Sequence, residues 1–377
     1  MASKGSALFE RHFQDLPDPR VERTRKHPLI NIVFMAVCGV LCGANSFAAI
    51  HEFAIDRRNW FARYLDLTHG IPSEDTFARV LARLDPGAFE KRLLSWMQAV
   101  QEVTEDRFLA IDGKTVRGSS DHETGRAAIH MVSAWATENQ LSLGQVVVDE
   151  KSNEITAIPE LLQLLEISGA LVTIDAMGCQ KEIAEQIRER GADYVLAAKQ
   201  NQPTLFEQVE GAISEALEED AKDIDEYQTL EKGHGRKETR TYAIFPAPAP
   251  ESVDPEELWR DLNAVGIAIS EREDSKGRHS METRYYILSR LVRVQEFAAA
   301  VRGHWGIENN LHWQLDVSFR EDECRVCRDH GPANLSVIRR FVLGLLKRDT
   351  SCKKGIEIKR NKCAANDEYR NKVLFTC

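Results

Sequence analysis

The sequence predicts an α/β protein in which a mixed β-sheet is flanked by helices and preceded by a small all-α domain. Three changes of pattern support this prediction. Residues 29–102 show the apolar spacing of helices. After Glu105 the apolar residues form short runs rich in β-branched side chains, with helical stretches between them. From about residue 292 the helical spacing returns. Strand and helix patterns in this order are typical of a mixed sheet covered by helices.

The composition is that of an ordinary globular protein. The chain has 377 residues, 43% of them hydrophobic, which allows two domains and a large core. Its formal net charge of -10 gives no general sign of nucleic-acid binding, but eleven basic and four acidic residues lie between Arg339 and Lys372. The eight cysteines are scattered and follow no secretory signal, which favours reduced thiols and a cytoplasmic location. The lone C-x-x-C at 324–327 lacks the second pair that a four-ligand zinc site needs.

The first domain is expected to span residues 1–102. Its uncharged run at 29–50 is long enough to cross a membrane. The Gly43-Ala44-Asn45 break interrupts this run, and Ser46 is a good N-cap for a second helix. We therefore expect two buried helices joined by a turn, and no membrane span.

Residues 46–84 have features of a helix-turn-helix, a motif that binds DNA. The segment "SEDTFARVLARL" begins at Ser73 and places Arg79 and Arg83 away from its apolar face. These arginines are candidate DNA contacts. A plain helical bundle with solvated arginines explains the same pattern, and the sequence leaves both interpretations open.

The second domain is expected to span residues 103–348. Its predicted strands and helices are followed by a β-rich insertion at about 200–290 and by a helical end. Residues 349–377 form a basic, cysteine-bearing tail with little apolar pattern. The tail is either a drifted or frame-altered end or a disordered DNA-binding arm. The sequence contains no G-x-G-x-x-G, G-x-x-x-x-G-K-[ST], G-x-S-x-G or H-E-x-x-H motif, which argues against the common nucleotide-binding, hydrolase and zinc-protease mechanisms.

Two aspartates end apolar strand patterns in the same way. Asp112 follows the run 108–111, and Asp175 follows the run 171–174. If these strands are neighbours, the carboxylates converge, and a divalent cation such as Mg²⁺ or Mn²⁺ would remove their mutual repulsion. The alternative is that each aspartate caps a turn or pairs with Lys114 or Arg117.

A third acid is expected in the helical segment after the insertion. Glu308, Asn309 and His312 share a stripe at helical spacing in "HWGIENNLHWQLDVSFREDE". Spacing alone does not decide between Glu308 and its rivals Asp316, Glu321, Asp322 and Glu323.

Five ordered motifs resemble the DDE transposases of bacterial insertion sequences, in the group named for the H-repeat-associated proteins. They are "FLAIDGKTVRGS", "VTIDAMGCQKEIAEQI", "YVLAAKQNQPTL", "GHGRKETR" and "RGHWGIENNLHWQLDVSFREDECR". The segments "FQDLPDPR", "GVLCGANSF" and "GIPSEDTFARVLARLDP" are similar to that group's associated N-terminal domain. The resemblance covers about residues 9–348.

The resemblance implies a ribonuclease-H-like core interrupted by the β-rich insertion. It implies that Asp112, Asp175 and Glu308 are the catalytic acids and hold Mg²⁺ or Mn²⁺, with two ions expected. Such an enzyme cleaves double-stranded DNA at the terminal inverted repeats of an insertion sequence and then transfers the strand to target DNA, as a homodimer on paired ends. We expect DNA contacts from the following residues: Lys114, Arg117, Lys199, Asn201, Arg236, Arg302, His304, His312, Arg79 and Arg83.

The chain departs from related insertion-sequence transposases around Glu308. Those proteins carry a tyrosine, an arginine and a lysine where this sequence has Val301, His304 and Leu315. This departure leaves DNA-hairpin steps open. Three alternatives also remain: a DNA-binding remnant of the same fold that no longer transposes, a helix-turn-helix regulator without catalysis, and a metal-dependent nuclease that acts on RNA.

Overall fold

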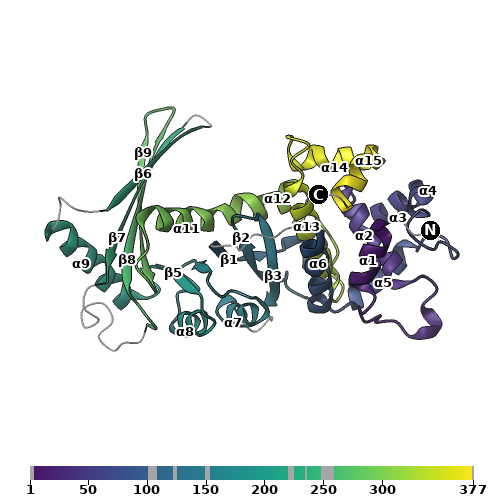
Figure 1. Ribbon diagram of the computed structural model, residues 1–377, viewed down its shortest axis with the longest axis horizontal. Coiled ribbons are helices and arrows are strands. Elements are labelled where there is room, and N and C mark those ends of the chain that lie inside the picture. The colour runs from purple at the N-terminus through teal and green to yellow at the C-terminus, as the bar shows by residue number, and fades with distance from the viewer. Residues whose placement is uncertain are drawn as a thin grey trace.

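The computed structural model in Figure 1 shows a helical region that contains both ends of the chain, joined to a long sheet covered by helices. The structure describes residues 4–100, 108–121, 125–148, 153–219, 225–233, 236–247 and 259–375. Nine strands and their helices carry the predicted α/β pattern.

The N-terminal region is helical, as the sequence predicts. Its helices are α1 (Lys4–Phe13), α2 (Leu29–Leu41), α3 (Phe47–Asp56), α4 (Arg58–Phe61), α5 (Glu74–Arg83) and α6 (Pro86–Val100), with a 3₁₀ turn at Glu22–Thr24. The uncharged run divides at Gly43, whose φ of 102° suits glycine. The Ser46 side chain accepts a hydrogen bond from the amide of Ala49 and caps α3. In the part of the chain that the structure describes, no helix is long and apolar enough to cross a membrane.

The sheet has the order β3-β2-β1-β4-β5-β9-β8-β7-β6. Its first half comprises β1 (Phe108–Thr115), β2 (His130–Ala136), β3 (Leu141–Val148), β4 (Leu171–Ile174) and β5 (Asp193–Ala198). The central strands β1, β4 and β5 are parallel, whereas β2 and β3 are antiparallel to their neighbours. This half is the ribonuclease-H-like sheet, with β1 and β4 side by side at its centre.

The insertion extends this sheet and does not form a separate one. It contributes α9 (Pro203–Glu219), β6 (Glu226–Gly233), β7 (Arg236–Pro246), β8 (Ala264–Asp274) and β9 (His279–Leu288). Strand β9 pairs with β5 in antiparallel register, from Val195 opposite Leu288 to Ala198 opposite Tyr285. The far ends of these strands rise away from the rest of the molecule in Figure 1.

Helices cover both faces of the sheet. Leu109 and Ile111 pack with α7 (Glu154–Leu164) and α8 (Lys181–Glu189) on one face. Ala110, one residue out of phase, packs on the other face, which is covered by α11 (Val294–Ile307) and α13 (Gly331–Arg348). Side chains on the Ala110 side of β1 therefore point toward α11 and the segment that follows it.

The basic tail is folded, which corrects the expectation of a disordered arm. It forms α14 (Ile356–Ala365) and α15 (Asp367–Phe375), which pack beside the N-terminal helices (Figure 1). Two of its arginines are buried: Arg360 donates to the carbonyl of Val40, and Arg370 lies over the Trp60 ring at 4.3 Å. The apolar pattern is weak because charged side chains occupy core positions through hydrogen bonds and ring contacts.

Candidate active site

Asp112 and Asp175 lie beside each other on neighbouring strands. Ile111 and Ile174 are register partners in the parallel pair β1–β4, and the two aspartates are the next residues along each strand. One detail differs from the prediction, because β1 does not end at Asp112. Its pairing with β4 stops at Ile111, but its pairing with β2 continues to Thr115. Asp112 thus projects from a continuous strand, which fixes its direction more firmly than a loop would.

Glu308 comes from the opposite layer, where α11 changes into a π-helical turn (Glu308–His312) before α12 (Trp313–Val317). π-Helical turns are rare and often occur at functional sites. His312 Nδ1 lies 2.8 Å from Glu308 Oε2 and 3.6 Å from Asp112 Oδ2. Ligand atoms of Asp112, Glu308 and His312 all lie within 4.8 Å of one another. Segments far apart in the sequence therefore meet in one group of metal-ligating side chains.

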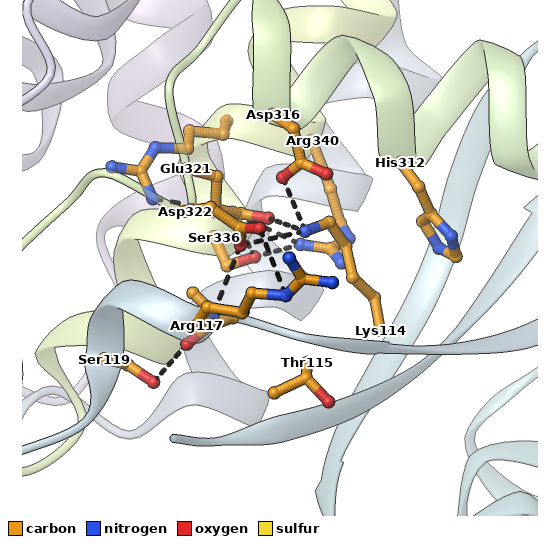
Figure 2. Close-up of polar contacts among 12 residues, drawn as sticks. Lys114, Thr115, Arg117, Ser119, His312, Asp316, Glu321, Asp322, Ser336 and Arg340 are labelled. Atoms are coloured by element: carbon orange, nitrogen blue, oxygen red, sulfur yellow. Dashed lines mark hydrogen bonds and ion pairs between the residues drawn. The ribbon is translucent and has the colours of Figure 1, made fainter.

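Three of the four rival acids, Asp316, Glu321 and Asp322, are balanced by cations within the protein (Figure 2). Lys114 Nζ lies 2.6 Å from Asp316 Oδ1, 3.4 Å from Asp322 Oδ1 and 3.8 Å from Glu321 Oε2. Glu321 is completely buried, accepts a hydrogen bond from Ser336 and pairs with the arginines of α13. We call this group the Lys114 cluster; its members are Lys114, Asp316, Glu321, Asp322, Ser336, Arg339 and Arg340. Glu323 is exposed.

The three proposed catalytic acids differ from these rivals in having no lysine or arginine partner among the described residues. Within the residues that the structure describes, no lysine or arginine forms an ion pair with Asp112, Asp175 or Glu308. Burial raises the pKa of Asp112 to about 6, and the charges of Asp175 and Glu308 add to this effect while His312 opposes it. The hydrogen bond from His312 holds the pKa of Glu308 below its usual value. An uncompensated carboxylate that is largely buried, as Asp112 is, is costly unless a cation joins it.

The loop after β4 holds Asp175 in place. Asp175 Oδ1 accepts hydrogen bonds from the amides of Met177 and Gly178, at 3.1 and 3.4 Å. The Asn201 amide donates to the carbonyl of Ala176 at 2.6 Å, so Asn201 supports this loop from the end of β5. The sequence predicted Asn201 as a DNA contact, and the structure adds this supporting role.

A groove opens beside Asp175. Its volume is about 790 Å³, and Lys199, Arg284 and Tyr285 are among the residues that line it. The Arg284 guanidinium lies over the Trp305 ring at 3.9 Å and donates to Glu282 Oε1 at 2.6 Å. The sequence analysis missed both residues. Trp305 lies three residues before Glu308 and offered a signal, whereas Arg284 on β9 is brought here only by the pairing of β9 with β5.

Seven predicted DNA contacts are exposed: Arg79, Arg83, Arg117, Lys199, Asn201, Arg236 and Arg302. Arg302 forms an ion pair with Glu231 at 3.2 Å, and Arg117 lies 3.7 Å from Asp322 while remaining 82% exposed. Their side chains are accessible to a polyanion.

Three predicted DNA contacts need correction. Lys114 is only 7% exposed and its ammonium is already surrounded by carboxylates, so no phosphate can reach it. His312 is buried between Glu308 and Asp112, which makes it a member of the acid group. His304 is within hydrogen-bonding distance of Thr173 Oγ1, at 3.2 Å, and burial lowers its pKa to about 4, so its ring is neutral at physiological pH. A neutral ring facing β4 is a poor phosphate contact.

The donor set of Asp112, Glu308 and His312 fits a divalent cation. Carboxylate oxygens suit Mg²⁺ or Mn²⁺, and an imidazole nitrogen shifts the preference toward Mn²⁺. Asp175 lies next to Asp112 in register and could serve the same cation or a second one.

Sequence comparisons agree with this geometry. Residues 104–343 match the family described as "Transposase DDE domain", and residues 10–97 match the family described as "DDE_Tnp_1-associated". The chain is 43% identical to "Putative transposase YncI" of Escherichia coli O157:H7 over 364 residues, which cover 96% of this chain and 93% of the relative. It is 38% identical to "H repeat-associated putative transposase YhhI" of Escherichia coli K12, covering 96% of each.

A solved structure, the piggyBac transposase synaptic complex with hairpin DNA, aligns with a TM-score of 0.43 and 10% identity, covering 97% of this chain and 76% of that one. The family matches and the relatives in Escherichia coli are sufficient to assign the family, and this structural alignment is not needed for the assignment. This chain belongs to the DDE transposase family.

Proposed function

We propose that this protein is an active transposase that cuts DNA at the terminal inverted repeats of an insertion sequence and joins the freed end to target DNA. Asp112, Asp175 and Glu308 are the proposed catalytic acids. The observation that carries the proposal is the group formed by Asp112, Glu308 and His312, whose ligand atoms lie within 4.8 Å while every nearby rival acid except the exposed Glu323 is paired with a cation of the protein.

The acids are proposed to hold Mg²⁺ or Mn²⁺, with two ions when Asp175 takes part. Bound ions of this kind lower the pKa of a water ligand and stabilise the negative charge that develops on a transferring phosphoryl group. The protein's own residues hold the three carboxylates in position. Strand β1 fixes Asp112, the amides after β4 orient Asp175, and His312 holds the Glu308 carboxylate in its ionised form.

The DNA is proposed to lie along the groove beside Asp175. Lys199 and Arg284 line this groove, and the Arg284 guanidinium lies over the Trp305 ring while one of its nitrogens donates to Glu282. Arginine stacked on an aromatic ring retains its donors for phosphate oxygens. The exposed arginines of α5 and of β7 would add contacts farther along a duplex, which explains how a chain of net charge -10 could bind a polyanion. The homodimer on paired ends and the cytoplasmic location stay predictions.

The test is strand cleavage of a labelled duplex that carries the element's own terminal repeat, with Mg²⁺ or Mn²⁺. Removing any one acid, in Asp112→Ala, Asp175→Ala or Glu308→Ala, should lower the cleavage rate roughly 10³-fold, because several kcal/mol of transition-state stabilisation are lost. Glu323→Ala is the matched control, because this acid is exposed and lies outside the group; its rate should match the wild type.

Three results would contradict the proposal. Wild-type protein that binds the repeat without cutting it in either metal would be the DNA-binding remnant. Cleavage that survives Glu308→Ala would mean that another acid completes the site. A preference for the same sequence as RNA would identify an RNA nuclease.

A further inference from the structure

The inference concerns Lys114 and rests on the metal site proposed above. We propose that Lys114 is a positioning residue for that site: its ion pair with Asp316 sets the register of the Glu308 helix against β1 and thereby holds Glu308 at the right separation from Asp112. Lys114 contacts neither DNA nor metal in this role.

Two side-chain contacts, called cross-links below although neither is covalent, join strand β1 to the facing helical segment. Asp112 and Lys114 are two residues apart on β1, so their side chains leave the same face of the sheet. Glu308, His312 and Asp316 follow one another at intervals of four residues on the facing helical segment. The first cross-link joins His312 to Asp112 at 3.6 Å, and the second joins Lys114 to Asp316 at 2.6 Å. Figure 2 shows Asp316 and His312 on the same stretch of ribbon.

The second cross-link matters because the helix is irregular at the site. α11 ends at Ile307 and the π-helical turn occupies Glu308–His312, so regular i to i+4 bonding does not by itself fix the direction of the Glu308 side chain. Contacts on both sides of the π-helical turn fix the direction of that side chain. On the N-terminal side, α11 packs on β1 and β4; on the C-terminal side, the Lys114 cluster provides the anchor.

A close backbone approach strengthens the same anchor. The amide of Arg117 donates to Asp322 Oδ1 at 3.2 Å. A Cβ atom on Gly118 would lie 2.2 Å from the carbonyl oxygen of Cys324 and 2.7 Å from that of Asp322. The 3₁₀ turn Arg117–Ser119, which follows β1, thus packs against the residues that follow the Glu308 helix. This explains why a glycine stands at position 118 in the motif "IDGKTVRGS".

The experiment uses the sign of an electrostatic effect. Lys114 is close enough to lower the pKa of Glu308. If Lys114 acted only through its charge, Lys114→Met would remove a cation and strengthen Mn²⁺ binding, whereas Asp316→Asn would weaken it. If Lys114 positions Glu308 through Asp316, both variants should weaken Mn²⁺ binding, by about tenfold, the effect typical of residues that support metal ligands. Binding is measured by calorimetry and by the electron paramagnetic resonance of Mn²⁺ on the full-length, DNA-free protein.

Three variants complete the design. Lys114→Arg keeps the charge and should restore most of the affinity. Adding Lys114→Met to Glu308→Gln should cause no further loss, because there is no Glu308 carboxylate left to position. Asp193→Asn is the matched control: Asp193 pairs with Arg290 at 2.6 Å at the start of β5, so its loss should lower thermal stability without changing Mn²⁺ affinity.

The outcomes separate this inference from the proposed function. Wild-type protein that binds no Mn²⁺ would overturn the metal site itself. Wild-type binding with opposite effects of Lys114→Met and Asp316→Asn would keep the metal site and overturn the positioning role. If Lys114→Met fails to fold, Asp316→Asn, at a side chain that is 35% exposed, together with its combination with Glu308→Gln, decides the question by additivity.

Discussion

Two groups of acidic side chains lie next to each other between β1 and the helices above it, and they differ in what balances their charge. In the Lys114 cluster, each carboxylate has a lysine or arginine partner, and Glu321 is completely buried. In the group of Asp112, Glu308 and His312, only an imidazole stands between the carboxylates. Carboxylates that stabilise a fold are paired with lysine or arginine side chains of the same protein. Carboxylates that bind a metal ion have no such partner, and their negative charge remains available for the ion.

The largest effect is expected from Glu321→Gln. This change leaves the buried cations Arg339 and Arg340 without their carboxylate, so the free energy of unfolding should fall by about 3–5 kcal/mol. Urea denaturation measures it. Glu308→Gln is the matched control, because that side chain is 59% exposed and should leave stability nearly unchanged while abolishing cleavage. Equal losses of stability in the two variants would erase the distinction between the groups.

Asp112→Asn should do the opposite of Glu321→Gln and stabilise the metal-free fold. The pKa of Asp112 is raised to about 6 in the folded protein, above its ordinary value of 3.8, so the folded state binds this proton more tightly than the unfolded state does. Wild-type stability therefore falls as pH rises from about 4 to 6. The asparagine variant lacks this fall and should be more stable above pH 6, by about 3 kcal/mol.

Denaturation in chelator at several pH values checks this sign. The advantage of Asp112→Asn should vanish below pH 4, where the aspartate is protonated in both states. The pKa of Glu308 is lowered, so Glu308→Gln should show the reverse trend, with its small deficit present at neutral pH and lost in acid. A stability difference that does not change with pH would mean that Asp112 is not an uncompensated carboxylate.

Gly118→Ala tests the docking that supports the Lys114 cluster. The new methyl group would meet two carbonyl oxygens of the 322–324 segment, so we expect a loss of about 1–3 kcal/mol in the free energy of unfolding. Gly211→Ala in α9 is the control, because nothing lies within 4 Å of its Cβ position, and it should raise helix stability by up to about 1 kcal/mol. A neutral Gly118→Ala would show that the two segments are free to separate.

Arg117→Ala should have the smallest effect on folding. Its guanidinium is 82% exposed beside Asp322, so the change in unfolding free energy should stay within about 0.5 kcal/mol. If Arg117 contacts a phosphate, DNA affinity should weaken equally for specific and random duplexes, and the slope of affinity against salt should fall by about one ion. Titrations at several salt concentrations measure this slope, and an unchanged slope would remove Arg117 from the DNA surface.

The sequence predicts most of the fold and part of the site, for identifiable physical reasons. Aspartates that follow apolar runs locate Asp112 and Asp175, because a carboxylate beside a buried strand is costly unless something pairs with it. Spacing cannot choose Glu308 over Asp316, because that choice depends on Lys114, which lies far away in the sequence. The β-rich insertion is predicted, but its addition to the same sheet depends on the non-local pairing of β9 with β5.

The tail was the least predictable element, because its core positions are filled by cations. Arg360 and Arg370 make polar contacts with backbone carbonyls and lie over aromatic rings, and neither interaction leaves a hydrophobic period in the sequence. Residues that contribute through their apolar stems and ring contacts look like surface residues until their partners are known.

The joining of the two ends of the chain has a consequence for how this protein comes into being. Trp60 donates a hydrogen bond to Asn371, and Arg57 donates to the carbonyl of Ala364, so the first helices share one core with the last. During synthesis, the ribosome releases Asp112, Asp175 and Glu308 long before it releases α15. The helical region must wait for contacts of very large sequence separation, which makes its folding slow. A nascent chain thus acquires its complete fold only after synthesis has passed residue 371. A shift of reading frame beyond residue 349 would remove α14 and α15, whose side chains complete the core of the helical region.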